Sequence, residues 1–275
     1  MPQNLDQMPS MPSQTLRGFE RFSVPLLEAT NRLPLARLGL HFVSGWTFAH
    51  GFKLMNGRRW QVFGLEHMQA LDAPEGMVLT ANHRSFFDLF VVSTVLKFHT
   101  KLLRQLAFPV RSDFFYTHPL GVALNYTVAG ASMWPPVFRD DRRRELNPVG
   151  MRQLARTLGR GCVIGIHPEG TRNKGENPYE YLPRKPGLGQ LVLGCTPGVL
   201  IVPVYVGGLT NDVATEFKRT LQDNAREKQP VRIWFGQPFR ADELQPLHDP
   251  AVMTETVFAR IQELGEADRA WMAQR

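Results

Sequence analysis

MVLTANHRSFFDLFVVSTVLKF spans residues 77–98 and divides into two parts. Its first five residues form a short apolar run, which is typical of a buried strand. Residues 86–98 are apolar over a length that favours a helix instead. The polar turn Asn-His-Arg-Ser joins the two parts. This arrangement of a strand, a short turn and a helix is the unit from which α/β sheets are built.

The same alternation continues along the chain from about residue 58. Short apolar runs bounded by Gly, Pro and polar residues predict strands, and longer periodic segments predict helices. The expected strands are 58–68, 77–83, 162–168, 199–206 and 231–239, and the expected helices are 86–98, 151–159, 187–194 and 250–265. We therefore predict one α/β domain over residues 58–275, with a mostly parallel central sheet flanked by helices.

Two segments precede this domain. Residues 1–28 are expected to be a flexible polar tail, because their first sixteen residues lack the basic and apolar regions of a signal peptide. Residues 29–57 are expected to form an amphipathic helical segment, with Arg37 and Lys53 near the ends of its apolar stretch. Such a helix could lie at a lipid interface or pack on the domain, and the composition leaves both open.

No segment of the chain fits a membrane-spanning helix. Two stretches without charge, residues 114–138 and 186–211, are interrupted by Gly, Pro, Asn and Thr. A spanning helix needs about 20 mostly apolar residues. The second stretch instead predicts a short helix, a turn and a buried strand.

Composition narrows the class of partner. Lys and Arg total 32 against 25 Asp and Glu, a net charge of +7, which suits an anionic substrate, an anionic lipid surface or nucleic acid. The basic residues are dispersed and form no recognisable nucleic-acid module, so we expect no nucleic-acid partner. Cys162 and Cys195 have no metal-ligand spacing and are expected in the core. The histidines show no HExxH pattern, and we expect no metal.

Two polar motifs follow two of the predicted strands, where ligands gather in parallel sheets. The first is His83-x4-Asp88, and the second is Glu169-Gly170-Thr171-Arg172. His83 falls in the turn after the strand, and Asp88 falls in the first turn of the following helix. The carboxylate can then hold one imidazole nitrogen while the other accepts a proton, which is how a general base activates a hydroxyl group.

These two motifs together resemble the glycerolipid acyltransferase family, which includes the 1-acylglycerol-3-phosphate acyltransferases. The resemblance covers roughly residues 58–245 and extends to Lys185-Pro186-Gly187 and to the buried strand at 199–204.

The resemblance assigns a role to each motif residue. It implies that His83 is the general base and Asp88 its orienting carboxylate. Arg172 matches the residue that binds the acceptor phosphate, and Lys185 would add a second cation. By the same resemblance, Glu169, Gly170 and Thr171 would shape the loop.

The implied reaction is transfer of a fatty acyl group from acyl-CoA or acyl carrier protein to a hydroxyl of a lysophospholipid or glycerol phosphate. The expected acceptor is 1-acylglycerol-3-phosphate, which would give phosphatidate, and no cofactor is implied beyond the thioester co-substrate. The chain has no Gly-x-Ser-x-Gly motif, so no covalent acyl-enzyme is expected. The resemblance places such an enzyme at the cytoplasmic face of a membrane, as a peripheral or monotopic protein.

The chain departs from the family pattern at two places. The stretch 130–139 lacks an arginine at the usual distance; Arg139 or one of the arginines at 142–144 could replace it, although the run RDDRRRE favours a solvated turn. His167 stands where the family usually has an aromatic residue, and we expect a core histidine bonded to the backbone. A different lipid acceptor and a catalytically inert lipid-binding relative therefore remain alternatives, although His83 and Asp88 favour an enzyme.

Overall fold

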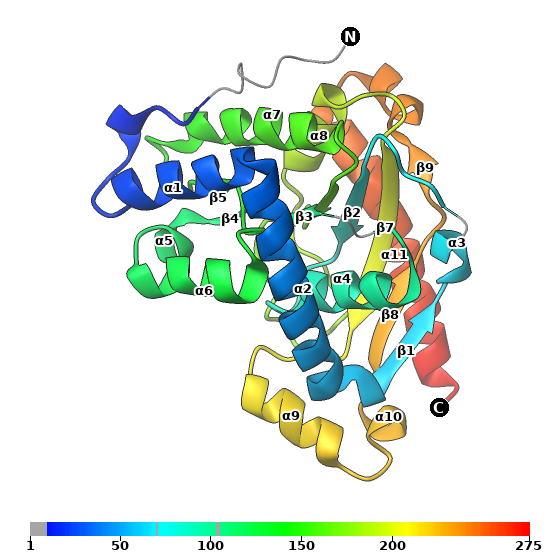
Figure 1. The fold of residues 1–275 in the computed structure, drawn as a ribbon. Helices are drawn as coiled ribbons and strands as arrows, with labels where there is room; N and C mark the ends of the chain where they lie inside the picture. The colour runs from blue at the N-terminus through cyan, green and yellow to red at the C-terminus, as the bar shows by residue number, and fades with distance from the viewer. Residues whose placement is uncertain (1–9, 70, 103–104) are drawn as a thin grey trace.

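The computed structural model describes residues 10–69, 71–102 and 105–275, and its core is one mixed sheet (Figure 1). The strand order is β1-β8-β7-β2-β6-β3, and β9 pairs with β7. The β7–β8 and β7–β9 pairs are antiparallel, whereas the other pairs are parallel. The strands of this sheet are β1 (Trp60–Phe63), β2 (Met77–Ala81), β3 (Leu106–Ala107), β6 (Val163–Ile166), β7 (Leu200–Gly207), β8 (Val231–Phe235) and β9 (Phe239–Arg240). A separate two-stranded sheet pairs β4 (Val110–Arg111) with β5 (Pro136–Val137).

Helices cover both faces of the main sheet (Figure 1). One face packs on α4 (Asp88–His99) and α2 (Pro34–Asn56), and the other packs on α7 (Asn147–Leu158), α8 (Gly187–Gly194) and α11 (Pro250–Ala273). Side chains of β2 alternate between these layers: Leu79 belongs to the α4 core, and Val78 belongs to the α7–α8 core. The predicted α/β domain with a mostly parallel sheet flanked by helices is confirmed.

The remaining helices are shorter or lie at the edges of the sheet. They are α1 (Glu20–Arg32), α3 (Glu66–Gln69), α5 (Ser112–Phe115), α6 (Pro119–Ala129), α9 (Val213–Leu221) and α10 (Ala225–Lys228). The first predicted strand is shorter than 58–68 because Gly64 ends it with φ +68°, where a Cβ would lie 2.0 Å from the Phe235 carbonyl oxygen. The closing helix is longer than predicted and continues to Ala273.

The first helix of the structure crosses the boundary that the sequence predicts at residue 28, between a polar tail and a helical segment. Residues 20–28, which are expected above to belong to a flexible polar tail, form most of α1. Residues 1–9 of that expected tail lie outside the described residues. Val24 and Leu27 are fully buried in a cluster that includes Trp134 and Phe138. The reason is a three-residue spacing of apolar side chains, which gives an otherwise polar helix one face to bury.

α2 carries apolar side chains on both of its faces. Ala49 and Phe52 are buried against the domain, whereas Phe42, Trp46 and Leu54 are exposed by 72%, 61% and 75%. The inner face therefore packs on the domain, and the outer face presents large apolar side chains to the surroundings. No helix within residues 10–69, 71–102 and 105–275 is long and apolar enough to span a bilayer.

Candidate active site

The pairing of β2 with β6 brings the two sequence motifs together. Thr80 of β2 is in register with Ile166 of β6, and the strands are parallel. His83 and His167, which follow these positions, therefore meet at the same edge of the sheet. The Asn82 side chain fixes the turn, because its amide bonds both the N–H (2.8 Å) and the carbonyl (2.9 Å) of Val206 on β7.

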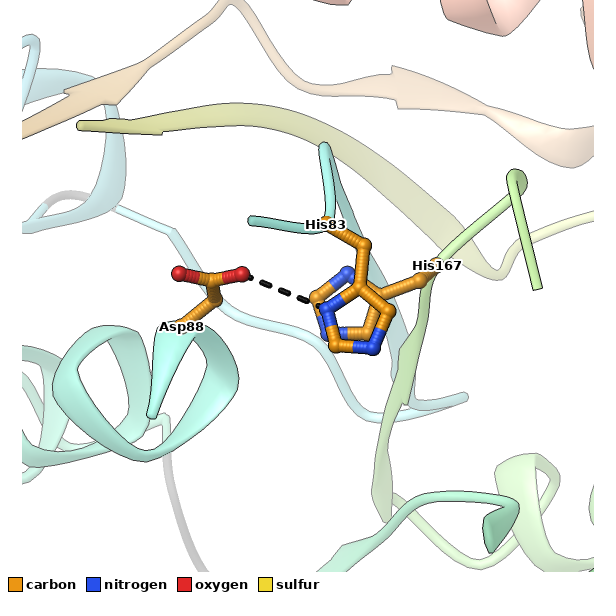
Figure 2. A group of neighbouring side chains, drawn as sticks. All are labelled: His83, Asp88 and His167. Atoms are coloured by element: carbon orange, nitrogen blue, oxygen red, sulfur yellow. Dashed lines mark hydrogen bonds and ion pairs between the residues drawn. The ribbon is translucent and has the colours of Figure 1, made fainter. Parts of the chain in front are cut away.

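His83 and Asp88 form a pair across the turn between β2 and α4 (Figure 2). The distance from His83 Nδ1 to Asp88 Oδ2 is 3.3 Å. The same oxygen accepts the backbone N–H groups of Arg84 and Ser85, each at 2.8 Å, so the carboxylate is locked in place. Asp88 is 1% exposed, and nitrogen Nε2 of His83 is left for another partner.

His167 lies flat against the His83 ring (Figure 2). The ring centroids are 3.8 Å apart and the planes differ by 9°. His167 Nδ1 lies 2.9 Å from the Ala81 carbonyl oxygen, so this nitrogen carries the proton that it donates. The predicted backbone bond of His167 is confirmed. The sequence does not predict its stacking on His83, because this depends on β2 and β6 being neighbours in the sheet.

These three side chains bring potential metal-ligand atoms within 4.8 Å of one another. A metal ion needs lone pairs that converge on one point. The rings of His83 and His167 are parallel, so their in-plane lone pairs run side by side and do not converge. The arrangement therefore suits a proton-accepting histidine better than a metal site.

Burial sets the protonation of the pair. Burial, followed by the positive charges of Arg172 and Arg139, lowers the pKa of His83 to about 3. Burial raises the pKa of Asp88 to about 6, although the bonds from Ser85 and Arg84 oppose the rise. Near neutral pH the imidazole is therefore uncharged and can accept a proton, while the carboxylate is mostly ionised.

Glu169 ties the second motif to the first. Its carboxylate accepts the backbone N–H of His83 at 2.6 Å and that of Leu182 at 3.1 Å, and the residue is 2% exposed. Burial raises the pKa of Glu169, and these two bonds oppose the rise. The next residue, Gly170, has φ +64°, which turns the loop outward. Glu169 thus links its own loop to the backbone at His83 and at Leu182.

Arg172 is held beside the start of α4. Its Nη1 donates to Asn211 Oδ1 at 2.7 Å, and the same oxygen accepts the Phe86 N–H at 2.9 Å. Thr171 and Lys185 are exposed. The Lys185 stem lies beside Gly170, where a Cβ would be 3.3 Å from Lys185 Cγ. Asn211 was not singled out from the sequence, although a polar residue shortly after β7 is a signal that could have identified it.

Arg139 also reaches this site, contrary to the expectation of a solvated turn. Its Nη2 donates to the Gly170 carbonyl oxygen at 2.8 Å, and its charge acts on His83. Burial lowers the pKa of Arg139, and Arg111 lowers it further. Arg143, in the same run, turns away and pairs with Glu20 at 2.6 Å.

A family model described as acyltransferase matches residues 59–207, which is more than half of the chain, and the protein therefore belongs to the acyltransferase family. Among solved structures, the chain is similar to the 1-acyl-sn-glycerophosphate (LPA) acyltransferase PlsC from Thermotoga maritima. That match has 18% identity and a TM-score of 0.48, and covers 93% of this chain and 85% of the other. A search of curated proteins finds no significant match.

Proposed function

We propose that the protein transfers a fatty acyl group from acyl-CoA or acyl carrier protein to the free hydroxyl of 1-acylglycerol-3-phosphate, which yields phosphatidate. The observation that carries this proposal is a neutral His83, held by Asp88 through Nδ1, with Arg172 and Arg139 close enough to lower its pKa. A base and two guanidinium groups at one edge of a sheet suit an acceptor that carries both a hydroxyl and a phosphate.

The reaction needs one proton acceptor and no nucleophile from the protein. His83 Nε2 takes the proton from the acceptor hydroxyl as the hydroxyl oxygen attacks the thioester carbonyl carbon. The tetrahedral intermediate then collapses, the carbon–sulfur bond breaks, and the imidazolium returns the proton to the leaving thiolate. Asp88 holds the Nδ1–H tautomer and stabilises the positive charge while it exists.

Arg172 and Arg139 are the groups that we assign to the acceptor phosphate. A guanidinium presents paired N–H donors that match two phosphate oxygens. Asn211 fixes one guanidinium and the Gly170 carbonyl fixes the other, so both are oriented before the acceptor arrives. We assign exposed Lys185 as a further cation at the entrance of the site.

We assign the acyl chain to a pocket on the α4 side of the sheet. It lies between α2, α4, β3 and the end of α6, and Phe48, Phe90 and Phe108 are among the residues that line it. Phe90 is two residues from Asp88 in sequence, and its ring centroid lies 5.3 Å from that of Phe86. Aromatic side chains thus extend from the start of α4 toward this pocket, which favours an apolar tail.

The outer face of α2 supports a lipid surface as the place of reaction, and we assign the protein to the membrane face from which thioester donors are supplied, the cytoplasmic one. Exposed Phe42 and Trp46 fit a helix that lies in the headgroup layer. A soluble protein has little reason to expose such large side chains along one helix.

Replacing both Phe42 and Trp46 with serine is expected to weaken binding to anionic vesicles by at least about tenfold, because each large apolar side chain contributes roughly 1.5–3 kcal/mol when buried. Both side chains are exposed, so the fold should survive, whereas deletion of α2 would remove Ala49 and Phe52 from the core. Vesicle co-sedimentation measures the change. Equal sedimentation of the variant and the unaltered protein would rule out this role for α2.

The pH dependence of kcat/KM should show an acid limb with a midpoint of about 6. Asp88 must be ionised to hold the Nδ1–H of His83, and burial raises its pKa to about 6. His83 itself stays neutral at lower pH because its pKa is lowered to about 3. The acid limb therefore reports protonation of Asp88 within the His83–Asp88 pair, and activity falls as the pH decreases. Initial rates at subsaturating acceptor measure this profile. A midpoint above about 7 would mean that the imidazole itself titrates near neutral pH, which contradicts the lowered pKa of His83.

A panel of acceptors tests the proposed substrate class. Purified protein is given one acyl-CoA with 1-acylglycerol-3-phosphate, glycerol 3-phosphate, a lysophospholipid with a larger headgroup, or monoacylglycerol. We expect the largest kcat/KM for 1-acylglycerol-3-phosphate and the smallest for monoacylglycerol, which lacks the phosphate. Preference for monoacylglycerol would overturn the roles of Arg172 and Arg139. Lipid binding without turnover would indicate the inert relative.

A further inference from the structure

α9 (Val213–Leu221) is oriented with its polar side chains inward and its apolar side chains outward. Glu216 is 0% exposed and Thr220 is 2% exposed, although both are polar. Val213, Phe217 and Leu221 are 55%, 46% and 62% exposed. The three recur every fourth residue, so they form one row along the outer side of the helix. A helix on a soluble surface normally has the opposite arrangement.

Buried polar contacts hold α9 in this orientation. The Glu216 carboxylate pairs with Arg59 Nη1 at 2.6 Å, and both side chains are fully buried. The same carboxylate accepts the Thr210 N–H at 2.8 Å. Arg59 also donates to the carbonyls of Gln229 and Gly208, so the guanidinium is anchored on several sides. Turning the apolar row inward would break a buried ion pair, so its exposure is built into the fold.

α9 packs against the C-terminal end of α2. The Thr220 hydroxyl donates to the carbonyl of Met55, which is near the end of α2. Leu221 follows Thr220, and Leu54, which is 75% exposed, precedes Met55. Leu221 and Leu54 are therefore each adjacent to this bond in sequence, and Figure 1 shows α9 beside the C-terminal end of α2.

Cations accompany the row. Residues 212–228 contain Lys218, Arg219, Arg226 and Lys228, against the exposed acids Asp212, Asp223 and Glu227. Arg219 also lies 3.7 Å from the buried Glu216 carboxylate. Glu216 is neutralised by Arg59 and does not face outward. An apolar row with excess positive charge around it fits the headgroup layer of an anionic bilayer.

We propose that α9 is a second lipid-contacting helix, which binds an anionic bilayer surface together with the outer face of α2. The inference rests on the proposed function in one respect, that α2 faces lipid.

α9 is also joined directly to the active site. Asn211, which holds Arg172, is followed by Asp212, whose side chain accepts the N–H groups of Ala214 and Thr215 at the start of α9. Contact with lipid at α9 therefore places the rim of the site at the bilayer.

The test is a double substitution, Phe217→Ser with Leu221→Ser, measured by co-sedimentation with vesicles of phosphatidylcholine and phosphatidylglycerol. We expect the apparent Kd to rise by at least about tenfold, because two large apolar side chains no longer enter the lipid. The matched control is Leu193→Ser with Val252→Ser, two exposed apolar residues on α8 and α11, on the opposite face of the sheet. The control should bind as the unaltered protein does, and the Tm of each variant checks its fold.

A probe at position 217 reports the contact directly. Both native cysteines are buried, so a Phe217→Cys variant can be labelled selectively with an environment-sensitive fluorophore. We expect its emission to shift to the blue when vesicles are added, and no shift from the same label at Val252→Cys. Neither measurement needs turnover, so loss of the acyltransferase assignment would leave this test standing.

Two results would overturn the proposal. One is unchanged vesicle binding by the double variant together with an unshifted probe. The other is a probe that shifts with protein concentration in the absence of lipid while light scattering shows a dimer that the double variant does not form. In that case a second copy of the chain covers the row, and lipid does not.

Discussion

His83→Ala is expected to lower kcat by about 10²- to 10⁴-fold, the range that a positioned general base contributes. The acceptor hydroxyl loses its proton acceptor, while the backbone around residue 83 keeps its bonds to Glu169 and Asn173, since these involve the main chain. The variant should therefore fold and still bind vesicles. Steady-state rates with acyl-CoA and 1-acylglycerol-3-phosphate measure the loss.

A matched control for this variant is His99→Ala. His99 is an exposed histidine near the end of α4, the same helix that begins with Asp88. Its replacement should leave kcat unchanged. Retention of more than a few per cent of the rate by folded His83→Ala protein would remove His83 from the mechanism.

Arg172→Ala is expected to raise the KM for the phosphate-bearing acceptor by about 10- to 100-fold, since a charge-assisted hydrogen bond contributes roughly 1.5–3 kcal/mol. The KM for the acyl donor should change little. Arg172→Lys should lie between, because lysine keeps the charge and loses the paired donors. Steady-state kinetics with each substrate varied in turn separate the two KM values.

Arg152→Ala supplies the control for charge alone. Arg152 is exposed on α7, and its loss removes one positive charge without touching the site. Both KM values should stay as they are in the unaltered protein. A raised donor KM with an unchanged acceptor KM in Arg172→Ala would reassign this arginine to the donor.

The parts of the site that the sequence predicts are those encoded locally. His83 and Asp88 are five residues apart, and a strand that turns into a helix brings their side chains to 3.3 Å. The sequence also places each motif directly after a strand, whereas their meeting depends on β2 and β6 being parallel neighbours in the sheet. Apolar periodicity similarly predicts helices α4, α7, α8 and α11 and strands β1, β2, β6, β7 and β8, but it does not predict α5, α6 or α9.

The parts that sequence alone does not predict depend on distant partners. Arg139 joins the site because the loop before α7 brings it to the Gly170 carbonyl oxygen, 31 positions along the chain. α9 has an inverted orientation because Glu216 is paired with Arg59, which is 157 positions away. In each case the pattern of one segment is compatible with a solvated surface, and only the tertiary contact selects the observed orientation.

Mass spectrometry of the product of one defined reaction is the most direct test of acyl transfer by His83. Purified protein is incubated with acyl-CoA and 1-acylglycerol-3-phosphate in mixed lipid vesicles, beside His83→Ala at the same concentration. The account predicts phosphatidate carrying the donor's acyl chain, one free thiol for each ester formed, and at least about a hundredfold less product from the variant. Equal amounts of product from both proteins, or no acylated product from folded protein bound to vesicles, would contradict it.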